Sequence, residues 1–176
     1  MDLSLTIWFN AIAKHLTGVL PLFSDWIVYV IFGFGALWIA VHHLGRFRYM
    51  VIDSMYTLAT PIFFSAVLSE SLSKLISRDR PFVASKEITQ LIEHGADASF
   101  PSSHMSVMVA MAVALWYRNH VLGYLTFTLA IFSGLARIGA GLHYPSDILV
   151  GLLIGLICGA ATHKFTKEAR LRALRS

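Results

Sequence analysis

Three short segments of the chain carry side chains that can transfer phosphoryl groups. They are Arg80-Pro81, Pro101-Ser102-Ser103-His104, and the run Arg137-x5-His143-x3-Asp147. Arginine presents a planar fork of donors that suits phosphate oxygens. A carboxylate near one imidazole nitrogen fixes the tautomer and leaves the other nitrogen free as a nucleophile. Because phosphoryl transfer depends mainly on positioning and charge neutralisation, these residue types indicate a phosphoryl-transfer site.

The second segment also predicts an anion site made by the backbone. Pro101 and the two serines are typical of a helix start, where Ser102 or Ser103 would serve as N-cap. Free N–H groups and the positive end of the helix dipole favour an anion there. His104 then lies in the first helical turn. We expect this turn to hold phosphate beside the arginines.

A metal site is the weaker interpretation of the same residues. His104, His143 and Asp147 are possible zinc ligands, but the neighbouring Arg80 and Arg137 would repel a cation. We therefore predict neither a metal nor a cofactor. The remaining histidines are interpreted as interfacial or structural: His15, His42, His43, His94, His120 and His163.

The composition places these segments in a membrane protein. Of the 176 residues, 56% are apolar and only 14% are charged, against about 25% charged in a typical globular domain. Apolar runs predict an all-α, polytopic bundle with five spans, near 25–44, 53–74, 103–118, 121–137 and 147–164. Residues 1–20 have one apolar arc and predict an interfacial helix, with a sixth span as the alternative. No cleavable signal peptide is evident.

The charges predict the orientation of this bundle. One side would carry the turns 45–50 and 118–120 and the basic tail 165–176, with eight basic residues against two acidic ones. By the positive-inside rule this side, with the C-terminus, is cytoplasmic. Alternation of the spans then brings all three segments, and the long loop 75–102, to the outer face. We predict one membrane-embedded domain over 1–176 in the cytoplasmic membrane, with its site toward the periplasm or exterior.

The three segments, in this order, resemble the signature of the type 2 phosphatidic acid phosphatase superfamily. The resemblance implies that His143 attacks phosphorus and forms a phosphohistidine, oriented by Asp147. It implies that His104 protonates the leaving oxygen and later activates water. The phosphate would be held, without a metal ion, by Arg80, Arg137, Ser102 and the Ser103 amide.

The chain departs from the family pattern at two positions. The family has a lysine seven residues before the motif arginine, and that position is Ser73 here. Lys74 is one residue away, about 100° round a helix, so Arg78 is the alternative source of this charge. The third motif often begins Ser-Arg, and here it is Ala136-Arg137, so one hydroxyl is lost.

The stretch from Arg80 to Ser102 is similar to the bacitracin-resistance type of undecaprenyl-diphosphate phosphatase. Alternative substrates are phosphatidylglycerophosphate, phosphatidate and lipid A. A different class also fits the cationic pocket, namely a non-enzymatic binder of anionic lipids or a transporter subunit. The pairing of His143 with Asp147 favours the enzyme, because an anion binder does not need a carboxylate there.

The expected partners are a lipid phosphate substrate and the bilayer, and not nucleic acid. Gly151, Gly155 and Gly159 recur every four residues in the last span, which favours close helix contact. Packing within the chain is the stronger interpretation of this stripe, and formation of a homo-oligomer is the weaker one.

Overall fold

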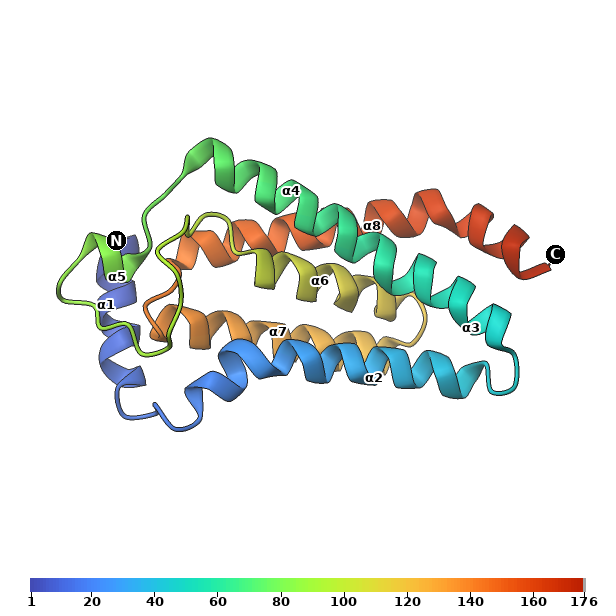
Figure 1. Cartoon of the computed structure of the whole chain (residues 1–176), viewed down its shortest axis with the longest axis horizontal. Helices are drawn as coiled ribbons and strands as arrows, with labels where there is room; N and C mark the ends of the chain where they lie inside the picture. Colours follow the sequence, from blue (N-terminus) through green and yellow to red (C-terminus); the bar gives the residue numbers. More distant parts are fainter. Residues whose placement is uncertain (176) are drawn as a thin grey trace.

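The computed structural model describes residues 1–175 as a bundle of helices that run along one axis (Figure 1). Its elements are, in chain order, α1 (Asp2–Ala13), η1 (Leu22–Trp26), α2 (Ile27–His42), α3 (Phe47–Ser54), η2 (Met55–Ala59), α4 (Thr60–Ile76), α5 (Pro81–Ala84), α6 (Ser103–Trp116), α7 (His120–Gly139) and α8 (Pro145–Arg175). The π-helical turns η1 and η2 lead directly into α2 and α4. The all-α architecture predicted from the sequence is thus confirmed.

Helix α6 is the centre of the bundle and packs against α4, α7 and α8. Its side chains Met105, Met108, Met111 and Leu115 are fully buried. With 14 residues it is about 21 Å long, which is short of a typical hydrocarbon core. The predicted span 103–118 corresponds to this shorter apolar helix. Among the described residues four helices are long and apolar enough to cross a membrane, Leu22–His42, Phe47–Ala84, His120–Gly139 and Pro145–Ala173.

The glycine stripe of α8 is used inside the chain. A Cβ at Gly151 would lie 2.6 Å from the carbonyl oxygen of Ser102, and one at Gly155 would lie 2.6 Å from that of Ser106. At Gly159 a Cβ would lie 2.7 Å from the Cβ of Val113. The stripe is covered by α6, so the weaker interpretation, a homo-oligomer through these glycines, is wrong for this face.

Helix α1 lies across one end of the bundle (Figure 1). Its 12 residues are too few for a span, so the structure does not support the sixth span. Two of its polar side chains, Thr6 and Asn10, are buried against the protein. The Asn10 amide donates to the carbonyls of Thr89 and Gly139, both at 2.8 Å, and its oxygen accepts from the Thr89 N–H at 3.0 Å. These bonds join α1 to the loop after α5 and to the end of α7.

The segments outside the spans also differ from expectation in part. The predicted loop 75–102 is mostly irregular and contains the single turn of α5. In the predicted basic tail 165–176, α8 continues to Arg175, and Ser176 lies outside the described residues. Lys167 and Arg170 belong to this helical extension, and the Arg170 side chain is held by Asp53.

Candidate active site

The three sequence segments meet at the end of the bundle that α1 crosses. Arg80 begins α5, Ser102 precedes α6, Arg137 is in the last turn of α7, and His143 and Asp147 flank the start of α8. All five side chains are buried. The prediction that alternating helices bring the segments to one face is confirmed.

The His143 ring is oriented by a backbone carbonyl. Its Nδ1 lies 2.8 Å from the carbonyl oxygen of Ser99. Because a carbonyl only accepts, Nδ1 carries the proton and Nε2 keeps its lone pair. Nε2 lies 3.4 Å from Nη1 of Arg80. The unprotonated nitrogen therefore points at a guanidinium, which is where a phosphate oxygen would bind.

Asp147 lies beside this ring without being its closest partner. Its Oδ2 is 3.7 Å from Nδ1 of His143 and accepts a hydrogen bond from the Tyr144 N–H at 2.9 Å. Its Oδ1 accepts from Arg78 at 2.8 Å. The sequence predicted that Asp147 itself orients the imidazole. In the structure the Ser99 carbonyl provides the hydrogen bond, and the buried carboxylate provides negative charge next to the ring.

Arg80 is held in place by hydrogen bonds to the outer loop and to the α7–α8 turn. Its Nη1 donates to the Leu142 carbonyl at 2.9 Å, and its Nε donates to Asp97 at 3.1 Å. A weaker bond at 3.4 Å reaches the Ala98 carbonyl. The guanidinium is therefore fixed beside His143 before any ligand arrives, as transition-state stabilisation requires.

Arg137 is only 2% exposed and keeps one donor unused. Its Nη1 donates to Asp25 at 3.1 Å and to the Ser24 carbonyl at 3.3 Å, while Nη2 lies 3.5 Å from Nε2 of His94. Its buried Nε has no partner among the described residues. An unsatisfied buried donor is costly, so this atom favours an acceptor such as a phosphate oxygen.

The second segment forms the helix start that the sequence predicted. Ser102 is the N-cap of α6, and its hydroxyl accepts from the Met105 N–H at 3.4 Å. Ser103 is the first residue of the helix, so its amide is among those without a partner in the helix. His104 follows and is half-buried, and the positive charges of Arg137 and Arg80 act on its ring.

The two candidates for the first-motif cation have different positions. The Lys74 side chain is 74% exposed and pairs with Glu70 at 3.3 Å, so the structure does not bring it to the cluster. Arg78 does reach the cluster, but it donates to Asp147 and to Asp2, both at 2.8 Å. Its guanidinium also stacks 3.7 Å from the centre of the Tyr144 ring. Arg78 is thus a partner of carboxylates at the edge of the site.

Sequence reasoning missed several residues that complete this cluster. His94 was interpreted as structural, yet it lies between Arg137 and Asp97, at 3.5 and 3.4 Å. Asp2 and Asp25, which pair with Arg78 and Arg137, are also part of the cluster. They come from elements more than 70 residues away from their arginine partners, so no local spacing connects them.

The environment of His143 keeps its ring neutral. Its pKa is lowered from 6.5 to about 4, chiefly because burial disfavours the charged ring, and the positive charges of Arg137 and Arg80 add to this effect. Between these two values the unfolded chain binds a proton that the folded chain does not. His143 therefore makes the folded state less stable as the pH falls through this window.

A pH profile checks this. We expect the acid limb of kcat/KM due to His143 near pH 4, well below the usual histidine value, because only the neutral ring is a nucleophile. Since phosphate substrates titrate as well, histidine NMR titration of the protein alone provides the second measurement. A ring that titrates near pH 6.5 contradicts the assignment.

The family comparison agrees with this geometry. Residues 54–171 match the PAP2 superfamily. The chain belongs to the PAP2 superfamily. Among curated relatives of this PAP2 protein, the undecaprenyl-diphosphatase BcrC of Bacillus subtilis (strain 168) is 36% identical over 104 residues, covering 59% of this chain and 53% of the relative. The putative undecaprenyl-diphosphatase YbjG of Escherichia coli (strain K12) is 34% identical over 148 residues, covering 83% and 66%.

Solved structures share the fold of this PAP2 protein. The crystal structure of Aquifex aeolicus LpxE matches with a TM-score of 0.69 at 24% identity and covers 93% of this chain and 94% of that one. A PAP2 type phosphatidylglycerolphosphate phosphatase from Bacillus subtilis matches with a TM-score of 0.55 at 18% identity, covering 94% and 91%. The chain spans about half to two thirds of the length of these curated relatives.

Proposed function

We propose that this PAP2 protein is a metal-independent lipid phosphatase that hydrolyses undecaprenyl diphosphate to undecaprenyl phosphate. The observation that carries the proposal is the His143 ring, whose unprotonated Nε2 faces Arg80 in a buried site that also holds Arg137. Two curated relatives are named for undecaprenyl diphosphate, BcrC and YbjG. Their similarity to this chain supports the choice of substrate.

The proposed reaction uses the residue roles that the family resemblance implies. Nε2 of His143 attacks the terminal phosphorus, and the bond from phosphorus to the bridging oxygen breaks. His104 donates a proton to that oxygen, leaving a phosphohistidine and the lipid monophosphate. His104 then takes a proton from water, whose oxygen attacks phosphorus, and the N–P bond breaks to release phosphate. Arg80, Arg137, Ser102 and the Ser103 amide neutralise and position the phosphate oxygens.

An apolar groove beside the site supports a substrate with a lipid tail. It lies between α1, η1 and α7, and its lining includes Ala136 and Gly139, which stand on either side of Arg137 in the sequence. Apolar side chains line its length, among them Phe9, Ile12, Leu16, Leu20 and Phe132. A phosphate held by Arg137 would therefore have an apolar surface next to it on which a prenyl tail can lie.

The proposed orientation places this site toward the exterior. The end of the bundle that holds the site carries α1 and the outer loop, while Arg46, Arg118 and the basic part of α8 lie at the opposite end (Figure 1). An excess of Lys and Arg is typical of the cytoplasmic side. Accessibility of single cysteines placed at each end to a membrane-impermeant reagent tests this orientation.

The test of the function is phosphate release from purified lipid phosphates with EDTA present. We expect undecaprenyl diphosphate to be hydrolysed faster than phosphatidylglycerophosphate, phosphatidate, lipid A or a short-chain soluble phosphate. Loss of turnover on chelation contradicts metal independence. Lipid binding without any phosphate release favours the non-enzymatic binder, in which the His143→Ala protein keeps its function.

Filling the groove tests the role of its apolar surface. In the Ala136→Phe protein we expect kcat/KM for the long-chain substrate to fall about tenfold, because the ring occupies space needed by the tail. Hydrolysis of a short-chain soluble phosphate should change less than about twofold. Val121→Phe adds similar bulk at an exposed position of the same helix and is the matched control. Equal losses on both substrates show that Ala136→Phe disturbs the phosphate site instead.

A further inference from the structure

A second polar cluster lies at the end of the bundle opposite to the candidate active site. Its centre is Asp53, a carboxylate that is 0% exposed. It accepts hydrogen bonds from Nη2 of Arg118, from Nε of Arg170 at 2.6 Å and from the Thr57 hydroxyl at 3.2 Å. Nε2 of His43 lies 3.1 Å from Oδ2 of Asp53, the oxygen that also accepts from Arg118. The cluster thus joins the end of α2, η2, the α6–α7 turn and α8.

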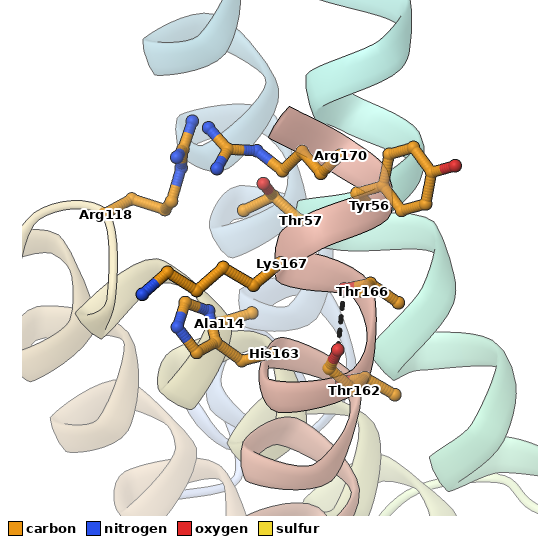
Figure 2. A pocket seen from close by; sticks show the side chains of 9 residues that line it. All are labelled: Tyr56, Thr57, Ala114, Arg118, Thr162, His163, Thr166, Lys167 and Arg170. Carbon is orange, nitrogen blue, oxygen red and sulfur yellow. Dashed lines mark hydrogen bonds between the residues drawn. The ribbon is translucent and has the colours of Figure 1, made fainter. Parts of the chain in front are cut away.

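A pocket with an excess of positive charge opens next to this carboxylate. Figure 2 shows the side chains that line it. The cationic side chains are Arg118, Lys167 and Arg170, and no acidic side chain lines the pocket. Asp53 is the one carboxylate bonded to the two arginines in the described part of the chain. One negative charge is therefore set against three positive ones.

Part of this positive charge is available to a ligand. The buried Nε of Arg118 has no partner among the described residues, although the same guanidinium reaches Asp53 through Nη2. In Figure 2 the Lys167 side chain extends between Arg118 and His163. An unsatisfied buried donor next to a lysine is suited to an oxyanion. A purely structural ion-pair cluster has no need of Lys167.

The surroundings of the pocket indicate where the anion comes from. Trp116 and Tyr117, at the end of α6, are about half exposed, and such aromatic side chains concentrate at the level of lipid headgroups. The ring of Tyr117 stacks on His163, a lining residue, with 3.8 Å between ring centres. Basic pockets between membrane helices are suited to the headgroups of anionic lipids.

We propose that this pocket binds the phosphate of an anionic lipid headgroup from the leaflet at this end of the bundle. Arg118 and Lys167 contact the phosphate oxygens, and Asp53 fixes the two arginines. The bound lipid joins η2, the α6–α7 turn and α8. This site lies at the end of the bundle opposite to His143 and takes no part in turnover, so it is independent of the proposed phosphatase activity.

The test measures lipid binding to the full chain in detergent by native mass spectrometry. Phosphatidylglycerol is the probe and phosphatidylcholine is the zwitterionic comparison. In the Lys167→Gln protein we expect phosphatidylglycerol binding to weaken about fivefold, the effect of one basic residue near a membrane surface. Lys164→Gln removes an equal charge from the same helix outside the pocket lining and should leave binding unchanged. Phosphate release should be the same in both variants and in the unsubstituted protein.

Three results overturn the proposal. Equal weakening in both lysine variants indicates general attraction between charges, and no weakening in Lys167→Gln indicates a structural ion-pair cluster. Inorganic phosphate that binds in a Lys167-dependent manner, without binding of phosphatidylglycerol, assigns the pocket to free phosphate.

Arg118→Lys is the second variant, because it keeps the charge next to Asp53 and removes the Nε donor. Unchanged phosphatidylglycerol binding in that variant contradicts the role given to Nε.

Discussion

Replacement of His143 by alanine is expected to lower the rate of phosphate release by a factor on the order of 10⁴ or more, since the nucleophile is lost. The rings of other side chains cannot substitute for it. Its Nδ1 is held by the Ser99 carbonyl at 2.8 Å and its Nε2 lies 3.4 Å from Arg80. Arg80 and Arg137 remain in the variant, so substrate binding should survive while turnover is lost.

The measurement combines steady-state phosphate release with chemical trapping of the intermediate. Unsubstituted protein quenched during turnover of ³²P-labelled substrate should carry acid-labile label on histidine, and the His143→Ala protein should carry none. His120→Ala is the control, because that exposed histidine lies at the other end of the bundle. Folded His143→Ala and His104→Ala proteins that release phosphate at the original rate would refute the mechanism.

The convergence of the three motifs was predictable because it depends on topology alone. Each motif is at the end of an apolar segment, and consecutive helices alternate in direction. The length of the third predicted span was less predictable. A membrane helix exposed to lipid must match the hydrocarbon thickness, but α6 is surrounded by α4, α7 and α8. A helix enclosed by protein need not be as long as the hydrocarbon core is thick. The 14 residues of α6 do not themselves reveal that neighbouring helices enclose it.

The orientation of the imidazole was beyond prediction for a different reason. The acceptor of His143 is the backbone carbonyl of Ser99, in an irregular loop. Backbone carbonyls leave no signature in side-chain types, whereas Asp147 does, so the sequence favoured the carboxylate as the orienting group. The same holds for Asn10, whose three hydrogen bonds go to backbone groups of Thr89 and Gly139.

The N-terminal helix belongs to the site through a chain of ionic contacts. Asp2 accepts from Arg78, Arg78 donates to Asp147, and Asp147 lies 3.7 Å from the His143 ring. The Ser146 N–H also donates to Asp2, at 3.1 Å. Arg78 is therefore neutralised by two carboxylates before a phosphate arrives. The cations left to bind phosphate are Arg80 and Arg137.

Because Arg137 is assigned to the phosphate and Lys74 is not, comparing kcat of the Arg137→Ala and Lys74→Ala variants tests this division of roles. We expect Arg137→Ala to lower kcat by about 10²- to 10³-fold, the range for a lost transition-state contact, because a fixed donor beside the phosphate disappears. Lys74→Ala should change kcat less than about twofold, since that side chain is 74% exposed and pairs with Glu70. Steady-state kinetics on undecaprenyl diphosphate gives both values.

The pair also separates a catalytic from a structural role of Arg137. Its guanidinium bonds to Asp25 and Ser24, so removal also leaves partners in η1 unpaired, and thermal unfolding of each variant must accompany the kinetics. Arg137→Lys keeps a positive charge near Asp25 but lacks the free Nε. If charge alone mattered, the lysine variant would restore activity. We expect it to remain impaired, because the orphaned Nε is the atom suited to the phosphate oxygen. Equal kcat losses for Arg137→Ala and Lys74→Ala would instead place Lys74 in the site, against its position on α4.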